Sequence, residues 1–180
     1  MQKKVKLGEI GQLKNGLNFA KKDVKNKCKI IGVADFANNT FPEYGLLDAI
    51  DESLVSDDFL LKDGDIIFVR SNGNKALVGR TMFIENICEK ICYSGFCIRF
   101  RPDIDKVNPQ YLFYLLRSPM VRKQYSYSQQ TNITNLSQDV LSGVTLFLPD
   151  IEIQNKQAKI LHDLDMKILS NTMINDNLAA

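Results

Sequence analysis

The sequence predicts an α+β protein, in which a globular domain of short twisted β-strands and a few helices, residues 1–148, precedes one long helix, residues 149–180. Turn-forming pairs such as Asn15-Gly16 and Asp63-Gly64 divide the first part into short segments rich in β-branched and aromatic residues. The pattern changes after Pro149, because no glycine or proline occurs from residue 150 to the end. With 44% hydrophobic residues, a chain of 180 residues can bury a core of its own.

Five segments of the first part have the length and composition of β-strands, and turn residues bound each of them. They are residues 28–33, 65–70, 78–84, 95–101 and 144–148. A helix is expected from Pro109, because proline favours the first turn of a helix and Asn108 precedes it. Its apolar residues recur at helical spacing until Ser118-Pro119 interrupts the pattern.

The long helix carries a repeat with alternating steps of three and four residues, which is the spacing of a coiled-coil seam. The seam positions are Gln154, Gln157, Leu161, Leu164, Ile168, Asn171, Asn175 and Leu178. Only half of them are apolar, and polar residues in a seam fix register and partner rather than add stability. We favour a partner helix, because about 27 helical residues span ~40 Å and outreach a compact domain of this size. The alternative is a helix folded back on its own domain.

The composition favours a soluble protein that works in the cytoplasm without membrane contact. No apolar run reaches the ~18 residues of a membrane span, and no apolar stretch follows the basic N-terminus as in a signal peptide. Cys28, Cys88, Cys92 and Cys97 are therefore expected to be reduced. Residues 92–97 alternate apolar and small side chains as a half-buried strand does. This pattern favours core cysteines over a zinc site, whose C-x-x-C pairs are missing, and no metal or cofactor is expected.

The net charge of +2 conceals a segregation of charge along the chain. Residues 1–34 hold nine lysines against two acids, a net charge of +7, whereas residues 35–65 hold nine acids against Lys62, a net charge of −8. Residues 66–133 return to +6, with ten basic and four acidic residues. Such segregation can produce a basic face that attracts phosphates, or simply a solvated surface.

The segment from Leu61 to Arg80 contains a polar loop with side chains suited to DNA. An apolar strand ends in this loop before a second strand begins near Val78. Arginine can form paired hydrogen bonds with guanine and asparagine with adenine, while serine and lysine can hold phosphates. The candidate contacts are Arg70, Ser71, Asn72, Asn74, Lys75 and Arg80. By composition alone, the segment also fits an ordinary polar hairpin loop.

A second candidate loop, residues 126–135, is a nearly uncharged run of amides and hydroxyls that follows Arg117, Arg122 and Lys123. Amide side chains can read adenine edges, although the run also fits a turn that caps the next helix. The candidate contacts in this loop are Gln129, Gln130, Thr131 and Asn132. Two further candidates, Lys21 and Lys22, are expected to touch only the DNA backbone.

Five segments follow one another in a characteristic order along the chain. They are Lys6-Leu7-Gly8-Glu9-Ile10, Lys62-Asp63-Gly64-Asp65-Ile66-Ile67 with Arg70-Ser71, Asn108-Pro109-Gln110-Tyr111-Leu112, Gln129-Gln130-Thr131 leading to Leu136, and Leu148-Pro149-Asp150-Ile151-Glu152-Ile153-Gln154 running into the helix. In this order they resemble the specificity subunits of Type I restriction-modification systems, which serve in phage defence. The resemblance extends over essentially the whole chain, and its closing segment is the most specific.

The resemblance implies a non-catalytic module that reads one half of a bipartite site on double-stranded DNA. It also implies that the long helix packs against a counterpart, sets the distance between the half-sites and helps to dock the methyltransferase (M) subunits, and through them the restriction (R) subunit. Complete specificity subunits usually contain two recognition domains and two helices, whereas this sequence has one of each. Two interpretations follow: a half-subunit that dimerises, or a fragment of a longer chain. The expected partner is accordingly a second copy or a second module, and two copies related by a two-fold axis would read a palindromic split site.

Catalytic interpretations of the sequence are disfavoured. Residues 108–111 resemble the Asn/Asp-Pro-Pro-aromatic motif of amino-methyltransferases, but Gln110 replaces the second proline and no glycine-rich cofactor loop precedes them. Residues 103–106 have the side chains of a nuclease centre with the wrong spacing, and His162 has no evident serine or cysteine partner. Two alternatives are kept: a recognition domain of another DNA-modification or phage-defence system, and a protein-interaction module that acts through the long helix.

Overall fold

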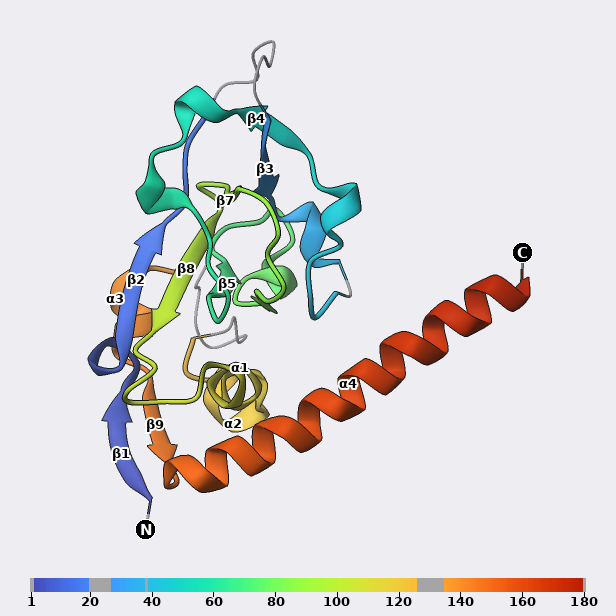
Figure 1. Cartoon of the computed structure of the whole chain (residues 1–180). Helices are drawn as coiled ribbons and strands as arrows, with labels where there is room; N and C mark the ends of the chain where they lie inside the picture. The colour runs from blue at the N-terminus through green and yellow to red at the C-terminus, as the bar shows by residue number, and fades with distance from the viewer. Residues whose placement is uncertain (1, 20–26, 38, 126–134, 180) are drawn as a thin grey trace.

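The computed structural model describes residues 2–19, 27–37, 39–125 and 135–179 (Figure 1). Within these ranges the strands form three small sheets, and helices pack beside them. The smallest sheet joins the two ends of the domain, because β1 (Lys3–Lys6) pairs antiparallel with β9 (Thr145–Leu148). This mixture of short strands, few helices and a long terminal helix confirms the α+β prediction.

The central sheet has the strand order β2-β8-β5-β6, and all of its pairs are antiparallel. Its strands are β2 (Gly11–Asn15), β8 (Cys97–Pro102), β5 (Ile66–Val69) and β6 (Thr81–Phe83). All four residues of β5 are apolar and buried. Successive side chains of a strand point to opposite faces, so Ile66 and Phe68 enter one hydrophobic core while Ile67 and Val69 enter a second.

The third sheet places β3 (Lys27–Ile31) between β4 (Ala49–Asp51) and β7 (Ile91–Tyr93). β3 is antiparallel to β4 and parallel to β7. From β7 the chain turns at residues 94–96 and enters β8 of the central sheet. The prediction of one half-buried strand over residues 92–97 is therefore wrong: the turn divides this segment, and the cysteines at both of its ends are fully buried.

Two short helices and one longer helix cover the first core. They are α1 (Pro109–Arg117), α2 (Pro119–Arg122) and α3 (Gln138–Ser142). Asn108 caps α1 as expected, since its Oδ1 accepts a hydrogen bond of 2.8 Å from the Tyr111 N–H. Ser118 then caps α2 through a bond of 3.4 Å to the Val121 N–H, which accounts for the interruption at Ser118-Pro119.

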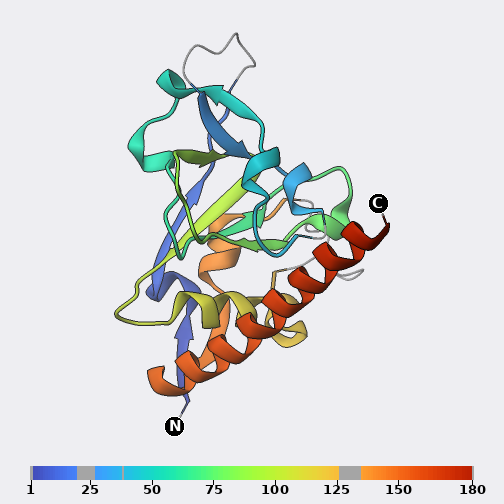
Figure 2. The same ribbon diagram turned by 45° about the vertical axis from the view of Figure 1, so that its right-hand side comes forward.

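The long terminal helix is confirmed as α4 (Ile151–Ala179), which contains 29 residues and is therefore about 44 Å long. Its first half packs against α1, and its second half extends past α1 toward the C-terminus (Figures 1 and 2). Within the described part of the chain, no helix combines the length and the apolar character needed to cross a membrane.

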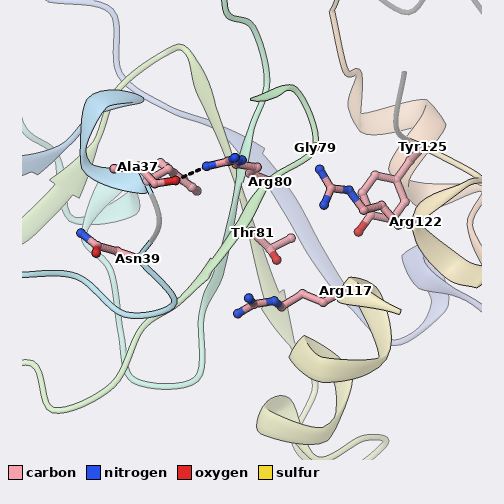
Figure 3. Close-up of a pocket in the computed structure, with 9 residues that line it drawn as sticks. Ala37, Asn39, Gly79, Arg80, Thr81, Arg117, Arg122 and Tyr125 are labelled. Carbon is pink, nitrogen blue, oxygen red and sulfur yellow. Dashed lines mark hydrogen bonds between the residues drawn. The ribbon is translucent and has the colours of Figure 1, made fainter. Parts of the chain in front are cut away.

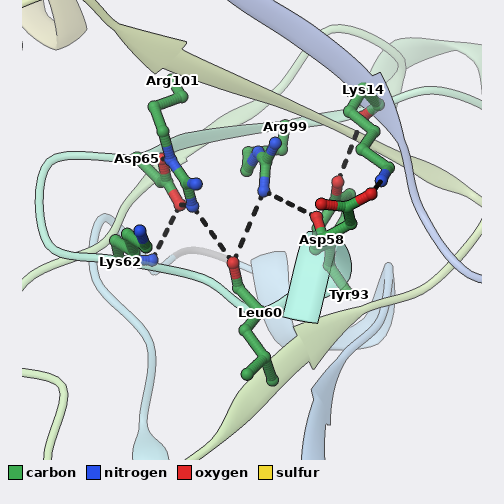
Figure 4. Close-up of polar contacts among 8 residues, drawn as sticks. All are labelled: Lys14, Asp58, Leu60, Lys62, Asp65, Tyr93, Arg99 and Arg101. Atoms are coloured by element: carbon green, nitrogen blue, oxygen red, sulfur yellow. Dashed lines mark hydrogen bonds and ion pairs between the residues drawn. The ribbon is translucent and has the colours of Figure 1, made fainter. Parts of the chain in front are cut away.

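A polar network inside the domain ties the central sheet to the acidic segment of the chain (Figure 4). Asp65, only 1% exposed, accepts bonds of 2.7 Å from both Nε and Nη2 of Arg101 and one of 2.8 Å from the Lys62 N–H. Arg99, 5% exposed, donates from Nη1 to the backbone oxygen of Asp58 at 3.0 Å. These two arginines are structural, so the net charge of residues 66–133 overstates the positive charge that phosphates can reach.

The four cysteines are free thiols, but they do not share one environment. Cys28, Cys92 and Cys97 are buried, and burial raises the pKa of Cys97 to about 12. Cys88 is exposed, because it lies in the loop between β6 and β7 rather than on a strand. The expectation of core cysteines is therefore wrong for Cys88. Among the described residues, no three His, Cys, Asp or Glu side chains are grouped closely enough to hold a metal ion.

Candidate nucleic-acid interface

The first candidate loop, which follows β5, is held between two distant segments of the chain. The Arg70 N–H donates to the Phe96 oxygen at 2.8 Å, and the Arg70 oxygen accepts from the Leu136 N–H at 2.9 Å. The next residue, Ser71, forms an antiparallel bridge with Asn135. The loop therefore lies beside the turn between β7 and β8 and beside the residues that follow the second candidate loop.

The asparagines of this loop shape its backbone. Asn72 Oδ1 accepts from the Asn74 N–H at 2.8 Å, and Asn74 Oδ1 accepts from the Ala76 N–H at 3.0 Å. These side-chain turns stabilise the loop and lead into a short 3-10 helix at Lys75–Leu77. Neither side-chain NH₂ group has a partner among the described residues. Both asparagines therefore have a structural role and still offer donors to a ligand.

Arg70 is half-buried and keeps most of its donor groups available. Its guanidinium makes one long hydrogen bond, 3.4 Å from Nη1 to the oxygen of Gly95. Beside it, the Phe96 side chain is 62% exposed at the turn between β7 and β8. Phe96 did not emerge from the sequence, where the only signal is an aromatic residue directly after the turn-forming Ser94-Gly95 pair.

The candidates in the second loop, Gln129, Gln130, Thr131 and Asn132, lie outside the described residues, as do Lys21 and Lys22. The described residues at the two ends of the second loop nevertheless contact the first loop or the residues that lead from it into β6. On one side the Tyr125 ring packs so tightly on Gly79 that a Cβ there would lie 3.2 Å from it. On the other side Asn135 bridges to Ser71. Two polar segments that are far apart in the sequence are thus anchored at the same place.

Arg80, unlike Arg70, lines a polar pocket of about 250 Å³ (Figure 3). Its Nη1 donates to the backbone oxygen of Ala37. Arg117 and Arg122, which the sequence placed only beside the second loop, line the same pocket. Nothing in the sequence groups Arg80 with Arg117 and Arg122. Arg80 reaches the pocket from the start of β6, whereas the other two reach it from α1 and α2.

The charge segregation seen in the sequence is partly neutralised by the fold. Lys14 pairs with Asp58 at 3.2 Å, and Lys29 pairs with Glu89 at 2.7 Å. Two lysines from the lysine-rich start of the chain are therefore already paired with acids. The arginines of the pocket differ, since none of the three forms an ion pair among the described residues.

The seam predicted on α4 is exposed except at its first position. Gln154 is 3% exposed and faces its own domain: Oε1 accepts from the Asn108 N–H at 3.0 Å, and Nε2 donates to the Pro149 oxygen at 2.8 Å. Gln154 is therefore unavailable to a partner helix, which corrects the predicted seam. The exposed seam positions are Gln157, Leu161, Leu164, Ile168, Asn171, Asn175 and Leu178.

A separate stripe of α4 faces the domain. After Gln154 it continues through Ala158, which is 1% exposed, and His162, whose ring meets the edge of Phe41 at a centroid distance of 5.8 Å. It then reaches Asp165, whose Oδ2 accepts 3.0 Å from the Tyr114 hydroxyl. At 3.6 residues per turn, the seam lies roughly a quarter of a turn from this stripe. Where the two meet, Ile168 and Leu169 line a groove of about 340 Å³ with residues 39–43.

Comparison with known proteins identifies the family. Residues 2–180 match the family described as "Type I restriction modification DNA specificity domain". The chain belongs to this family. It is 32% identical over 122 residues to the Type I restriction enzyme HindI specificity subunit of Haemophilus influenzae, covering 66% of this chain and 26% of that protein. It is 31% identical over 104 residues to a putative Type I restriction enzyme MjaX specificity subunit of Methanocaldococcus jannaschii, covering 57% of this chain and 24% of that protein.

This specificity domain therefore spans about a quarter of the length of these two curated relatives. Its fold is also that of solved structures. One comes from a structural study of the complex assembly and conformational transition of the type I R-M system. Its TM-score is 0.69 at 17% identity, and the match covers 94% of this chain and 39% of that chain. Another is the HsdS subunit from Thermoanaerobacter tengcongensis, with a TM-score of 0.65, 18% identity and coverage of 94% and 38%.

The resemblance drawn from five short segments is thus confirmed for nearly the whole chain. The family and both relatives are named for specificity, which agrees with the specificity role that the five segments predicted. At under 25% identity, the solved structures support the fold and nothing finer.

Proposed function

We propose that this specificity domain binds double-stranded DNA by sequence and reads one half of a bipartite site with its two polar loops. The supporting observation is the convergence of the loops: Ser71 of the first bridges to Asn135 at the end of the second. The shared anchor supports a single DNA groove as the common target of both loops. In this proposal Arg70 reads guanine through its available guanidinium, and Asn72 and Asn74 offer their amide groups to base edges.

We further propose that α4 pairs with the helix of a second recognition module or of a second copy. The exposed seam supports this proposal, because Leu164 is 51% exposed and Ile168 63% exposed although both are large and apolar. The groove beside Ile168 offers room for an apolar side chain of the partner helix. Paired helices would fix the spacing between half-sites and provide a surface on which M subunits dock, with the R subunit joining through them.

The first experiment identifies the DNA site and then tests Arg70 on it. Sequences are selected from a random DNA pool with the M subunit present, and binding is measured on the selected duplex and on a scrambled one. Replacing Arg70 by Ala should cost about 1–3 kcal/mol on the selected duplex and much less on the scrambled one. Equal losses on both duplexes would remove Arg70 from the base-reading residues.

A charge-preserving variant separates base reading from attraction to phosphates. Arg70→Lys keeps the positive charge but loses the planar fork that bonds guanine at two points. It should therefore lose discrimination while the salt dependence of binding stays close to that of the wild type. If binding shows no salt dependence on any duplex, DNA recognition by this domain is wrong, and the exposed face of α4 favours a protein-interaction module instead.

A further inference from the structure

Three arginines from separate parts of the chain converge on one pocket (Figure 3). Arg80 comes from the start of β6, Arg117 from the end of α1 and Arg122 from the end of α2. Phe36, Ala37, Asn39, Gly79, Thr81 and Tyr125 complete the lining. Among the described residues that line the pocket there is no carboxylate, so the three positive charges meet no counter-charge there.

The contacts of these arginines orient them but do not neutralise them. Arg80 Nη1 donates to the Ala37 oxygen, and Arg117 Nη1 donates to Thr40 Oγ1 at 3.0 Å. The Arg117 guanidinium also lies over the Phe113 ring, 5.1 Å from its centroid. These partners are uncharged. Arg80 and Arg122 are half-buried and Arg117 is exposed. Three guanidinium groups that line one pocket repel one another, and an anion bound between them removes this repulsion.

The chemistry of the lining suits a phosphate group. Guanidinium groups present planar pairs of N–H donors that match the oxygens of phosphate. The Thr81 hydroxyl also lines the pocket, as does Asn39, whose Nδ2 donates one hydrogen bond to the Asp35 oxygen at 3.3 Å. Among the described residues, neither Arg117 nor Arg122 pairs with a carboxylate, whereas Arg101 pairs with Asp65.

The pocket adjoins the proposed DNA-reading loops. Gly79 and Arg80 end the return from the first loop, and Tyr125 is the last described residue before the second. We propose that this three-arginine pocket binds a backbone phosphate of the DNA whose bases the loops read. The assignment rests on the proposed function. It gives Arg80 a phosphate rather than a base, and it adds Arg117 and Arg122 to the DNA-binding residues.

The test uses the full chain and the double variant Arg117→Gln/Arg122→Gln, with Lys123→Gln as matched control. Lys123 is exposed, neighbours Arg122 and does not line the pocket. The double variant should bind about tenfold to a hundredfold more weakly to selected and scrambled duplexes alike, since it cannot form the charged hydrogen bonds to phosphate. The slope of log affinity against log salt should become shallower by about one for each phosphate that the variant no longer neutralises. The control should change both quantities far less.

A second measurement keeps the proposal testable if the double variant misfolds. In the wild-type chain, the guanidinium Nε–H NMR signals of Arg80, Arg117 and Arg122 should shift when scrambled duplex is added, whereas the signal of the buried Arg99 should not. Signals of the pocket arginines that stay unchanged while the chain binds DNA would overturn the pocket and leave the proposed function standing. So would a double variant that binds like Lys123→Gln.

Inorganic phosphate separates the two possible sources of the ligand. If the wild-type chain binds neither duplex but the same three signals shift with inorganic phosphate, the proposed function fails, and the assignment to DNA backbone is overturned in favour of a free phosphate compound. Shifts with scrambled duplex at much lower concentration than with inorganic phosphate support the backbone assignment.

Discussion

Replacing Gln154 by Leu tests how α4 is fixed to the recognition domain. Gln154 is 3% exposed, and its amide satisfies the Asn108 N–H at 3.0 Å and the Pro149 oxygen at 2.8 Å. Leucine has a similar size but satisfies neither group. Two hydrogen bonds worth about 1 kcal/mol each disappear, and a buried unpaired N–H adds about 1 kcal/mol or more, so unfolding free energy should fall by about 2–4 kcal/mol.

The matched control is Gln157→Leu, three residues further along the same helix, where the side chain is exposed. It makes the same chemical change but should alter stability by less than about 0.5 kcal/mol. In thermal unfolding followed by circular dichroism, Gln154→Leu should lower Tm by about 5–15 °C for a chain of this size. Similar Tm values for the two variants would refute the reasoning that Gln154 anchors α4.

Three further predictions concern the interior of the domain. Asp65→Asn should lower unfolding free energy by about 2–3 kcal/mol in urea titration, because it leaves the partly exposed Arg101 without its carboxylate; an unchanged midpoint would contradict this role. A thiol reagent should modify Cys88 rapidly in the folded protein and the buried Cys28, Cys92 and Cys97 only on unfolding, and rapid modification of all four would contradict the burial. Burial raises the pKa of Glu85 above 4.5, so the folded state holds this proton to higher pH than the unfolded state does. Stability should therefore fall as pH rises from 4.5 through the folded pKa, and Glu85→Gln should flatten that slope, with an unchanged slope counting against the assignment.

The elements that depend on local chemistry were predictable from the sequence. Asn108-Pro109 marks the beginning of α1, because a side-chain cap and a proline act within one turn of chain. The strand after Asp63-Gly64 was also found. Strands β1, β2 and β4 were missed, because they are short and carry polar residues, and only their partners make them strands.

The candidate site was predictable only in part. The residues of the first loop were found, since their chemistry is visible in sequence. The pocket was not, because Arg80, Arg117 and Arg122 meet through the packing of α1 and α2 beside β6. Likewise, nothing in the sequence distinguishes the internal Arg99 from the half-buried Arg70. Arg99 is internal because alternation along β8 turns its side chain inward and because the acidic segment packs over it.

The long helix shows both sides of this division. The sequence alone determined its existence and length, because residues from 150 onward contain no helix-breaking glycine or proline. Only the tertiary structure decided which face meets the domain. A repeat gives the spacing of residues around a helix but not its rotation against a neighbour, and that rotation is set by Asn108, Tyr114 and Phe41. Gln154 consequently belongs to the domain, while Leu164 and Ile168 are left exposed for a partner.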